Sequence, residues 1–151
     1  MNLINKKIKN ATKVEYNGIK FNSKIELMVY KTLVENGFDP EYEPHKFTIF
    51  EGYKPTVPFY TINKNTKELS LNVIKQISIT YTPDFILRYK EWTIIIEVKG
   101  KINDVYPYKR KMFRKFLEDN TKGNILFFEV YTNKNVLQMI EIIKKYGNHQ
   151  G

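Results

Sequence analysis

"YTPDFILRYKEWTIIIEVKG", residues 81–100, contains two strongly apolar stretches that begin or end in charged residues. If Lys90 and Glu91 form a two-residue turn, residues whose numbers sum to 181 lie opposite each other in a β-hairpin. This register predicts a hairpin with one wholly apolar face, formed by the pairs Phe85–Ile96, Leu87–Ile94 and Tyr89–Trp92.

On the other face of this hairpin, Asp84 lies directly opposite Glu97, and Lys99 follows on the same side. Opposed residues have Cβ atoms about 4.5–5.5 Å apart, where like charges repel. Two such carboxylates must share a proton or bind a cation. Mg²⁺ needs only one or two carboxylates, together with water and substrate phosphate. The pattern indicates a metal site, while the spacing alone equally fits ordinary charges at strand ends.

The stretch "TPDF" followed by "EVKG", with "FNSKIE" upstream, resembles the signature of the PD-(D/E)XK nuclease superfamily. The resemblance is to its small phage endonucleases, its Holliday-junction-resolvase-like members and transposon-end endonucleases, and it covers about residues 18–116. It implies an α/β fold with a restriction-endonuclease-like core. In that core a central mixed β-sheet is flanked by helices in the order αβββαβ, here with a further C-terminal helix.

The same resemblance implies roles for four residues of the hairpin. Asp84 and Glu97 would bind Mg²⁺ or Mn²⁺, and the carbonyl of Val98 would be a further ligand. Lys99 would orient the attacking water or stabilise charge that develops on the phosphate. The reaction implied is metal-assisted hydrolysis of a phosphodiester bond.

Glu26 has two interpretations. Ser23 followed by Glu26 is a capping box, in which side chains satisfy the first amides of a helix. The residues alone favour this cap, although Glu26 also shares a helix face with Val29 and Leu33 and could turn toward the sheet. The resemblance instead implies that Glu26 completes the catalytic metal site, and both roles stay open.

Other candidates near the hairpin are weaker. Tyr81 could contact a substrate but is expected in the core. Glu43 could approach the site if its strand is adjacent to the hairpin, but it is expected to be a surface acid. Along the chain we expect one domain over residues 1–151, with a flexible basic N-terminal arm over residues 1–17. We expect helices at residues 23–36, 106–120 and 135–147, and strands at 41–50, 70–81, 84–89, 92–99 and 123–133.

The charge balance favours a polyanionic partner. Lys plus Arg number 25 and Asp plus Glu 16, which gives a net charge of +9. A basic segment follows the hairpin, and its cations are typical of contacts with phosphate groups, although a solvated surface helix is the alternative. The predicted DNA contacts are Lys101, Lys109, Arg110 and Arg114.

The composition also excludes several classes. The chain has no cysteine, which excludes disulfides, thiol nucleophiles and thiolate zinc sites. No apolar run is long enough for a membrane span, and the N-terminus lacks the apolar core of a signal peptide. The sequence contains no glycine-rich phosphate loop, so it does not indicate a nucleotide cofactor. We therefore expect a cytoplasmic protein that has no membrane partner.

Taken with the resemblance, these features predict a Mg²⁺- or Mn²⁺-dependent endodeoxyribonuclease. The specific expectation is a phage-encoded homodimer that cleaves branched DNA, such as Holliday junctions, in DNA recombination. One alternative is a sequence- or partner-guided nuclease subunit of a transposition or restriction system. The other is a non-catalytic nucleic-acid-binding module on the same fold.

Overall fold

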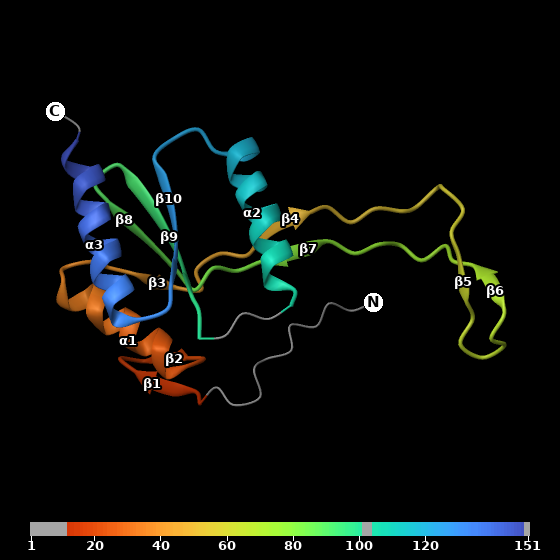
Figure 1. Cartoon of the computed structure of the whole chain (residues 1–151), viewed down its shortest axis with the longest axis horizontal. Helices are drawn as coiled ribbons and strands as arrows, with labels where there is room; N and C mark the ends of the chain where they lie inside the picture. Colours follow the sequence, from red (N-terminus) through yellow and green to blue (C-terminus); the bar gives the residue numbers. More distant parts are fainter. Residues whose placement is uncertain (1–11, 101–103, 150–151) are drawn as a thin grey trace.

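A mixed α/β fold with several small sheets is found in the computed structural model, which describes residues 12–100 and 104–149 (Figure 1). The largest sheet has four strands in the order β10-β9-β8-β3. Their bounds are Glu41–Tyr42 for β3, Phe85–Tyr89 for β8, Trp92–Val98 for β9 and Ile125–Val130 for β10.

Strand β8 is antiparallel to both of its neighbours, β3 and β9, whereas β10 runs parallel to β9. A parallel pair needs a crossover connection, and helix α2 (Tyr106–Asn120) provides it. Helix α1 (Lys24–Glu35) precedes β3. Counting only the central sheet and its helices, the order along the chain is a helix, the three antiparallel strands β3, β8 and β9, a crossover helix and the parallel strand β10. Helix α3 (Asn133–Asn148) closes the order.

The helices cover both faces of this sheet. Successive residues of a strand point to opposite faces, so Ile94 and Ile96 join the core formed with α1 and α3. Ile95 points the other way and belongs to a second cluster with Phe113 of α2. Because Glu97 follows Ile96, its side chain lies on the α2 face.

The hairpin register predicted from the sequence is confirmed. Phe85 pairs with Ile96, and the series continues to Tyr89 opposite Trp92. Lys90 in the turn adopts φ 53°, an unusual conformation for a residue with a side chain. Its ammonium donates to the carbonyl of Gly147 and to Oδ1 of Asn148, each at 3.0 Å. These bonds hold the turn against the end of α3.

The expected helices are also confirmed. Ser23 caps α1 by accepting a hydrogen bond from the N–H of Glu26, and Gly37 with φ 85° follows its end. Helix α2 fills the predicted range, and α3 begins two residues earlier than expected. In the described residues no helix combines the length and the apolar character that crossing a membrane requires.

Two of the expected strands are wrong as single elements. The segment 41–50 divides into β3 and β4 (Phe47–Phe50), because Glu43 has φ 46° and is followed by Pro44. The segment 70–81 divides into the end of β6 (Leu69–Leu71) and β7 (Ile79–Tyr81). Strands β4 and β7 pair with each other beside α2.

Between β4 and β7 the chain runs away from the body as two extended segments, which we call the finger (residues 51–78; Figure 1). At its root, a Cβ on Gly52 would lie 2.8 Å from the carbonyl oxygen of Gln76, so only glycine allows the two segments to approach this closely. Its tip is a hairpin of β5 (Tyr60–Ile62) and β6. No residue of the finger is buried.

The N-terminal region forms a further hairpin of β1 (Val14–Tyr16) and β2 (Ile19–Phe21), which contacts α1. The flexible arm expected over residues 1–17 is therefore wrong for Val14–Tyr16, since these residues pair in a strand. Residues 1–11 lie outside the described part of the chain.

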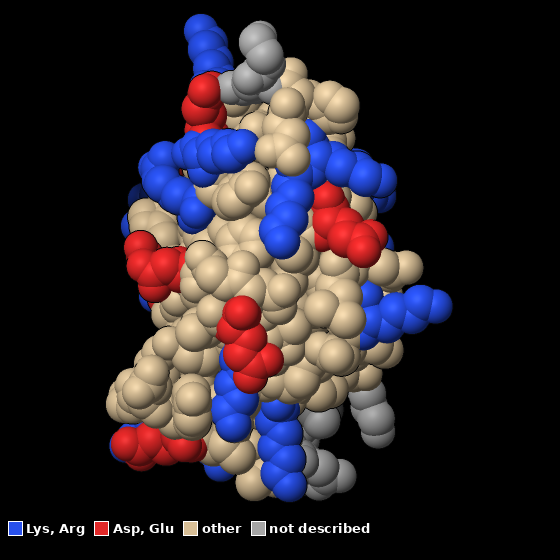
Figure 2. All heavy atoms as spheres, turned by 90° about the vertical axis from the view of Figure 1, so that its left-hand side faces the viewer, with Lys and Arg blue, Asp and Glu red and all other residues tan. Residues whose placement is uncertain are grey.

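The face carried by α3 and α1 is mixed in charge. Lys and Arg side chains are interspersed there with Asp and Glu, and uncharged residues cover much of the surface between them (Figure 2). The described part of this face therefore presents no continuous basic surface.

Candidate functional site

Asp84, directly before β8, and Glu97, near the end of β9, lie at the same end of the β8–β9 hairpin. Asp84 comes one residue before the Phe85–Ile96 pair, and Glu97 one residue after it. Oδ2 of Asp84 accepts a hydrogen bond from the N–H of Val98 at 2.7 Å. Burial raises the pKa of Asp84 well above its usual value, and the charges of Glu97 and Glu26 raise it further. The structure thus brings predicted site residues within electrostatic reach of one another.

Glu97 is only 7% exposed, and each of its two carboxylate oxygens contacts a different side chain. Its Oε1 lies 2.7 Å from Nζ of Lys99, and its Oε2 accepts a hydrogen bond from the hydroxyl of Tyr81. Burial raises the pKa of Glu97, and these two contacts act in the opposite direction. A buried carboxylate is normally paired in this way, because an isolated charge is costly to bury.

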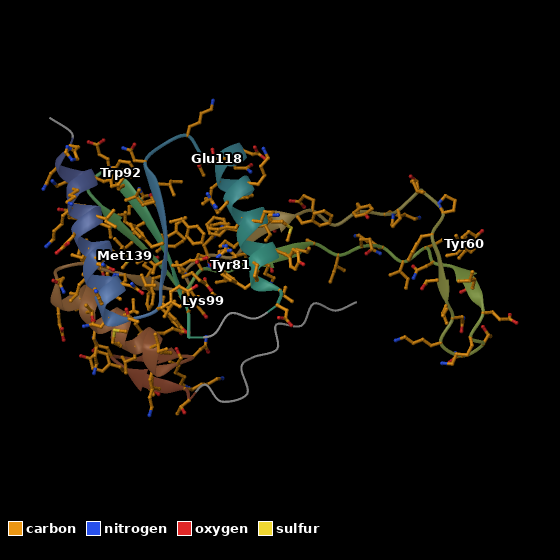
Figure 3. The ribbon with its side chains drawn as sticks, in the orientation of Figure 1. Tyr60, Tyr81, Trp92, Lys99, Glu118 and Met139 are labelled. Carbon is orange, nitrogen blue, oxygen red and sulfur yellow. The ribbon has the colours of Figure 1, made fainter. Side chains whose placement is uncertain are left out.

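Lys99 is itself fixed in position. Its ammonium lies 3.4 Å from the centroid of the Tyr106 ring, in a cation–π contact, and its side chain is 11% exposed. Figure 3 shows Lys99 and Tyr81 on the side of the sheet that faces α2. The ammonium is therefore both oriented and partly desolvated.

Glu26 combines features of its two interpretations. Its N–H donates to Oγ of Ser23 at 3.2 Å, which is one half of a capping box. Its carboxylate accepts hydrogen bonds from the N–H of Asn22 and the hydroxyl of Tyr42. Burial raises the pKa of Glu26, and these two bonds oppose the rise. Since the charge of Glu26 acts on Asp84, its carboxylate belongs to the surroundings of the site.

Asp84, Glu97 and Lys99 border a cavity of about 400 Å³ on the α2 side of the sheet, whereas Glu26 is not among the residues that line it. Three acids and three lysines line it, so opposite charges face one space. The charged lining residues are Glu43, Asp84, Glu97, Lys46, Lys99 and Lys109, and the remaining ones are Thr80, Tyr81, Thr82 and Tyr106.

The chemistry of these donors fits a hard divalent cation. Asp84 and Glu97 are carboxylates whose raised pKa values would be relieved by an added positive charge, and Glu43 lies at the same cavity. Within residues 12–100 and 104–149, no group of three or more His, Cys, Asp or Glu forms a ready cage for a metal. Mg²⁺ does not need such a cage, since water and substrate oxygens complete its shell. A ligand role for the Val98 carbonyl stays a prediction.

Comparison with known families gives one match. Residues 6–133 match the family described as "Protein of unknown function (DUF1064)". The chain belongs to this family. No curated protein and no solved structure matches the chain. The matched region of the DUF1064 domain includes the whole hairpin and extends through β10.

A further acid of the DUF1064 domain was not anticipated from the sequence. Glu129 on β10 is the direct neighbour of Glu97 on β9, and Asp84 directly precedes β8, the strand on the other side of β9. Its carboxylate accepts from Arg110 at 3.0 and 3.2 Å and from the Tyr106 hydroxyl at 2.7 Å. The signal in the sequence is an acid that interrupts the apolar run of a strand, as Glu97 does.

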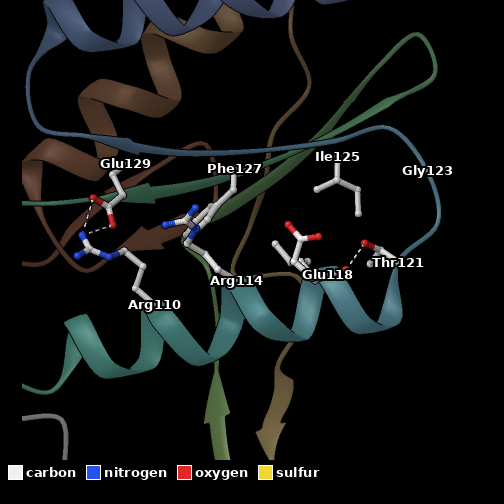
Figure 4. A pocket seen from close by; sticks show the side chains of 9 residues that line it. Arg110, Arg114, Glu118, Thr121, Gly123, Ile125, Phe127 and Glu129 are labelled. Carbon is white, nitrogen blue, oxygen red and sulfur yellow. Dashed lines mark hydrogen bonds and ion pairs between the residues drawn. The ribbon is translucent and has the colours of Figure 1, made fainter.

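The predicted DNA contacts fall in different places. Lys109 lines the cavity, and burial lowers its pKa, although the charge of Glu97 opposes this. Arg110 forms an ion pair with Glu129. Arg114 lines a second cavity of about 640 Å³ between α2 and β10 (Figure 4). Lys101 lies outside the described residues.

Among the other residues that border the first cavity are Glu43, Lys46 and Tyr106. Glu43 is exposed, as expected for a surface acid, and it also reaches the site because β3 lies beside β8; its N–H donates to the carbonyl of Asp84 at 2.8 Å. Lys46 lies directly before β4, and Tyr106 is the first residue of α2. Nothing in their local sequence marks them, because their position depends on tertiary packing.

Proposed function

We propose that this protein is a Mg²⁺- or Mn²⁺-dependent DNA endonuclease of the PD-(D/E)XK type, with a restriction-endonuclease-like core. The observation that carries this is the meeting of Asp84, Glu97 and Lys99 at one cavity, supplied by a single hairpin. The element order α1, β3, β8, β9, α2 and β10 supports the αβββαβ core.

Each residue has a distinct task in this proposal. Asp84 and Glu97 would hold the cation, which supplies Lewis acidity and lowers the pKa of bound water. Lys99 directs its ammonium toward the position where negative charge develops on the phosphate, and a preorganised charge of this kind stabilises a transition state. Glu97 and the Tyr106 ring keep that ammonium in place.

The surroundings suit a phosphodiester substrate. Lys46 and Lys109 at the same cavity would bind phosphate groups that flank the scissile bond. One cavity of this kind cuts one strand, so paired cuts across a branched DNA need two copies of the chain. We accordingly propose branched DNA as the substrate and a homodimer as the active form.

The decisive experiment compares a labelled four-way junction with a matched linear duplex, in Mg²⁺, in Mn²⁺ and in chelator. We expect metal-dependent cleavage of the junction, slowed at least about 100-fold by Glu97→Gln. Glu141→Gln on the exposed outer face of α3 is the matched control and should cut at the native rate. Binding of Mn²⁺, measured by calorimetry, should weaken in Glu97→Gln but not in the control.

Other outcomes would change the assignment. Equal cutting of both substrates would keep the nuclease and remove the preference for branches. Metal binding and DNA binding without cutting would favour a partner-guided nuclease subunit. DNA binding that is indifferent to metal ions and to Glu97→Gln would leave a non-catalytic binding module.

A further inference from the structure

The finger exposes an unusual amount of apolar surface. All ten of its large apolar side chains are exposed, with exposed fractions between 51% and 80%. They are Tyr53, Val57, Phe59, Tyr60, Ile62, Leu69, Leu71, Val73, Ile74 and Ile77. Larger contiguous apolar surfaces on soluble proteins mark contact sites rather than free surface.

At the tip of the finger the apolar side chains share one face. Tyr60 pairs with Leu71 and Ile62 with Leu69, so these four side chains point to the same side of the β5–β6 hairpin. The pair Thr61 and Ser70 between them points to the opposite side. The hairpin is therefore apolar on one face and polar on the other, as expected for a two-stranded unit that packs against something.

The turn of this hairpin is well ordered by its own hydrogen bonds. Oδ1 of Asn63 accepts from the N–H groups of Asn65 and Thr66 at 2.9 and 3.2 Å, and the N–H of Asn63 donates to the carbonyl of Glu68 at 2.8 Å. An isolated two-stranded hairpin is at best marginally stable in water. A shaped hairpin with an uncovered apolar face thus needs a partner surface.

Within residues 12–100 and 104–149, the body of the same chain does not provide that surface. The finger points away from the central sheet, and Tyr60 lies near its far end (Figures 1 and 3). Nor does the finger have the charge of a nucleic-acid contact. Residues 51–78 contain four lysines and two glutamates, a net +2 that is close, per residue, to the net charge of the chain as a whole, and two of the lysines, Lys64 and Lys67, lie in the turn.

We infer that the finger, through its apolar tip face and the exposed apolar side chains along its length, binds the finger of a second copy of this chain. A two-fold dimer uses the same patch on both partners, and an apolar face without strong charge is compatible with itself. The ten exposed side chains of the whole finger, four of them on the tip face and six elsewhere along it, amount to about 1,000 Å² per chain at roughly 100 Å² each. Covering most of this reaches the roughly 800 Å² per partner of a stable specific interface.

The test measures mass in solution by sedimentation equilibrium, without DNA or metal ion. The native chain should sediment at twice its own mass. Leu69→Lys should raise the dissociation constant at least about 100-fold, because an unpaired ammonium would have to be buried in the contact. Ser70→Lys, the next residue on the opposite face, should remain a dimer. Ile62→Lys should repeat the result of Leu69→Lys from the other strand.

Several results would overturn the inference. A monomeric native chain would do so, as would a Leu69→Lys variant that sediments like the native chain. A Ser70→Lys variant whose dimer dissociates as readily as that of Leu69→Lys would also contradict a contact through the apolar face. A native monomer whose DNA binding is lost in Leu69→Lys would assign the finger to nucleic acid instead. None of these readouts uses cleavage, so they are independent of the proposed nuclease activity.

Discussion

Replacing Asp84 by Asn should make the metal-free protein more stable at neutral pH. Burial and the charges of Glu97 and Glu26 raise the pKa of Asp84. A group whose pKa is raised by folding stabilises the fold fully only below its ordinary pKa, and this contribution is lost as pH rises through the raised pKa. Asp84→Asn removes that loss, so its advantage should grow from acid toward neutral pH.

The expected size follows from the geometry of the hairpin. Opposed residues lie about 5 Å apart, and two like charges at that distance repel by about 3 kcal/mol at an effective dielectric constant of 20. The Asn oxygen still accepts from the N–H of Val98, but a neutral acceptor weakens this bond by about 1 kcal/mol. The attraction of Lys99 for Asp84 is lost as well. A net gain of about 1–2 kcal/mol remains, which corresponds to a Tm rise of about 3–6 °C in a domain of this size.

The assay is thermal unfolding followed by circular dichroism, in chelator, at a series of pH values from acid to neutral. Asp39→Asn, an exposed residue at which the same substitution relieves no buried charge, is the matched control and should leave Tm unchanged. Adding Mn²⁺ should stabilise the native protein by about 2.7 kcal/mol at 100 times its Kd, and should do so far less in Asp84→Asn. A Tm of Asp84→Asn at or below the native value at neutral pH, or a gain that is the same at every pH, would refute the reasoning.

Two further predictions concern Lys99 and the first helix. Lys99→Met leaves the Glu97 carboxylate buried without its ammonium, so the free energy of unfolding should fall by about 3 kcal/mol at neutral pH. The double variant Lys99→Met with Glu97→Gln should recover most of that loss in chemical denaturation, and a purely additive loss would contradict the pairing. Ser23→Ala should cost about 1 kcal/mol as a lost helix cap while cleavage persists, whereas Glu26→Gln should abolish cleavage. If both variants cut equally well, Glu26 is a cap and not part of the site.

The local sequence pattern was sufficient to predict the hairpin and the positions of its charged residues. Pairing the apolar residues between Phe85 and Ile96 about a two-residue turn gives one wholly apolar face, whereas a three-residue loop would have shifted this register. That register alone places Asp84 beside Glu97. The helix that begins after Ser23 was likewise predictable, because its cap and its following glycine are local signals.

The rest of the site depends on packing that no local pattern encodes. Glu43 reaches the cavity because β3 pairs with β8, and Glu129 lies beside Glu97 because the α2 crossover makes β10 parallel to β9. The strand assignments at 41–50 and 70–81 were wrong for a related reason. Apolar residues such as Leu69 and Leu71 are typical of a core strand, but here they lie exposed on the finger.

The place of the finger in the chain has an evolutionary consequence. Residues 43–84 separate β3 from β8, two neighbours in the central sheet, and the finger is contained within this connection. Doubling the length of a flexible connection costs only about 0.6 kcal/mol of closure entropy. Since the finger contributes no buried residue, its length and surface can diverge among relatives while the sheet keeps its acids in register. Substitutions in the finger can therefore change its binding partner during evolution without altering the acidic residues of the central sheet.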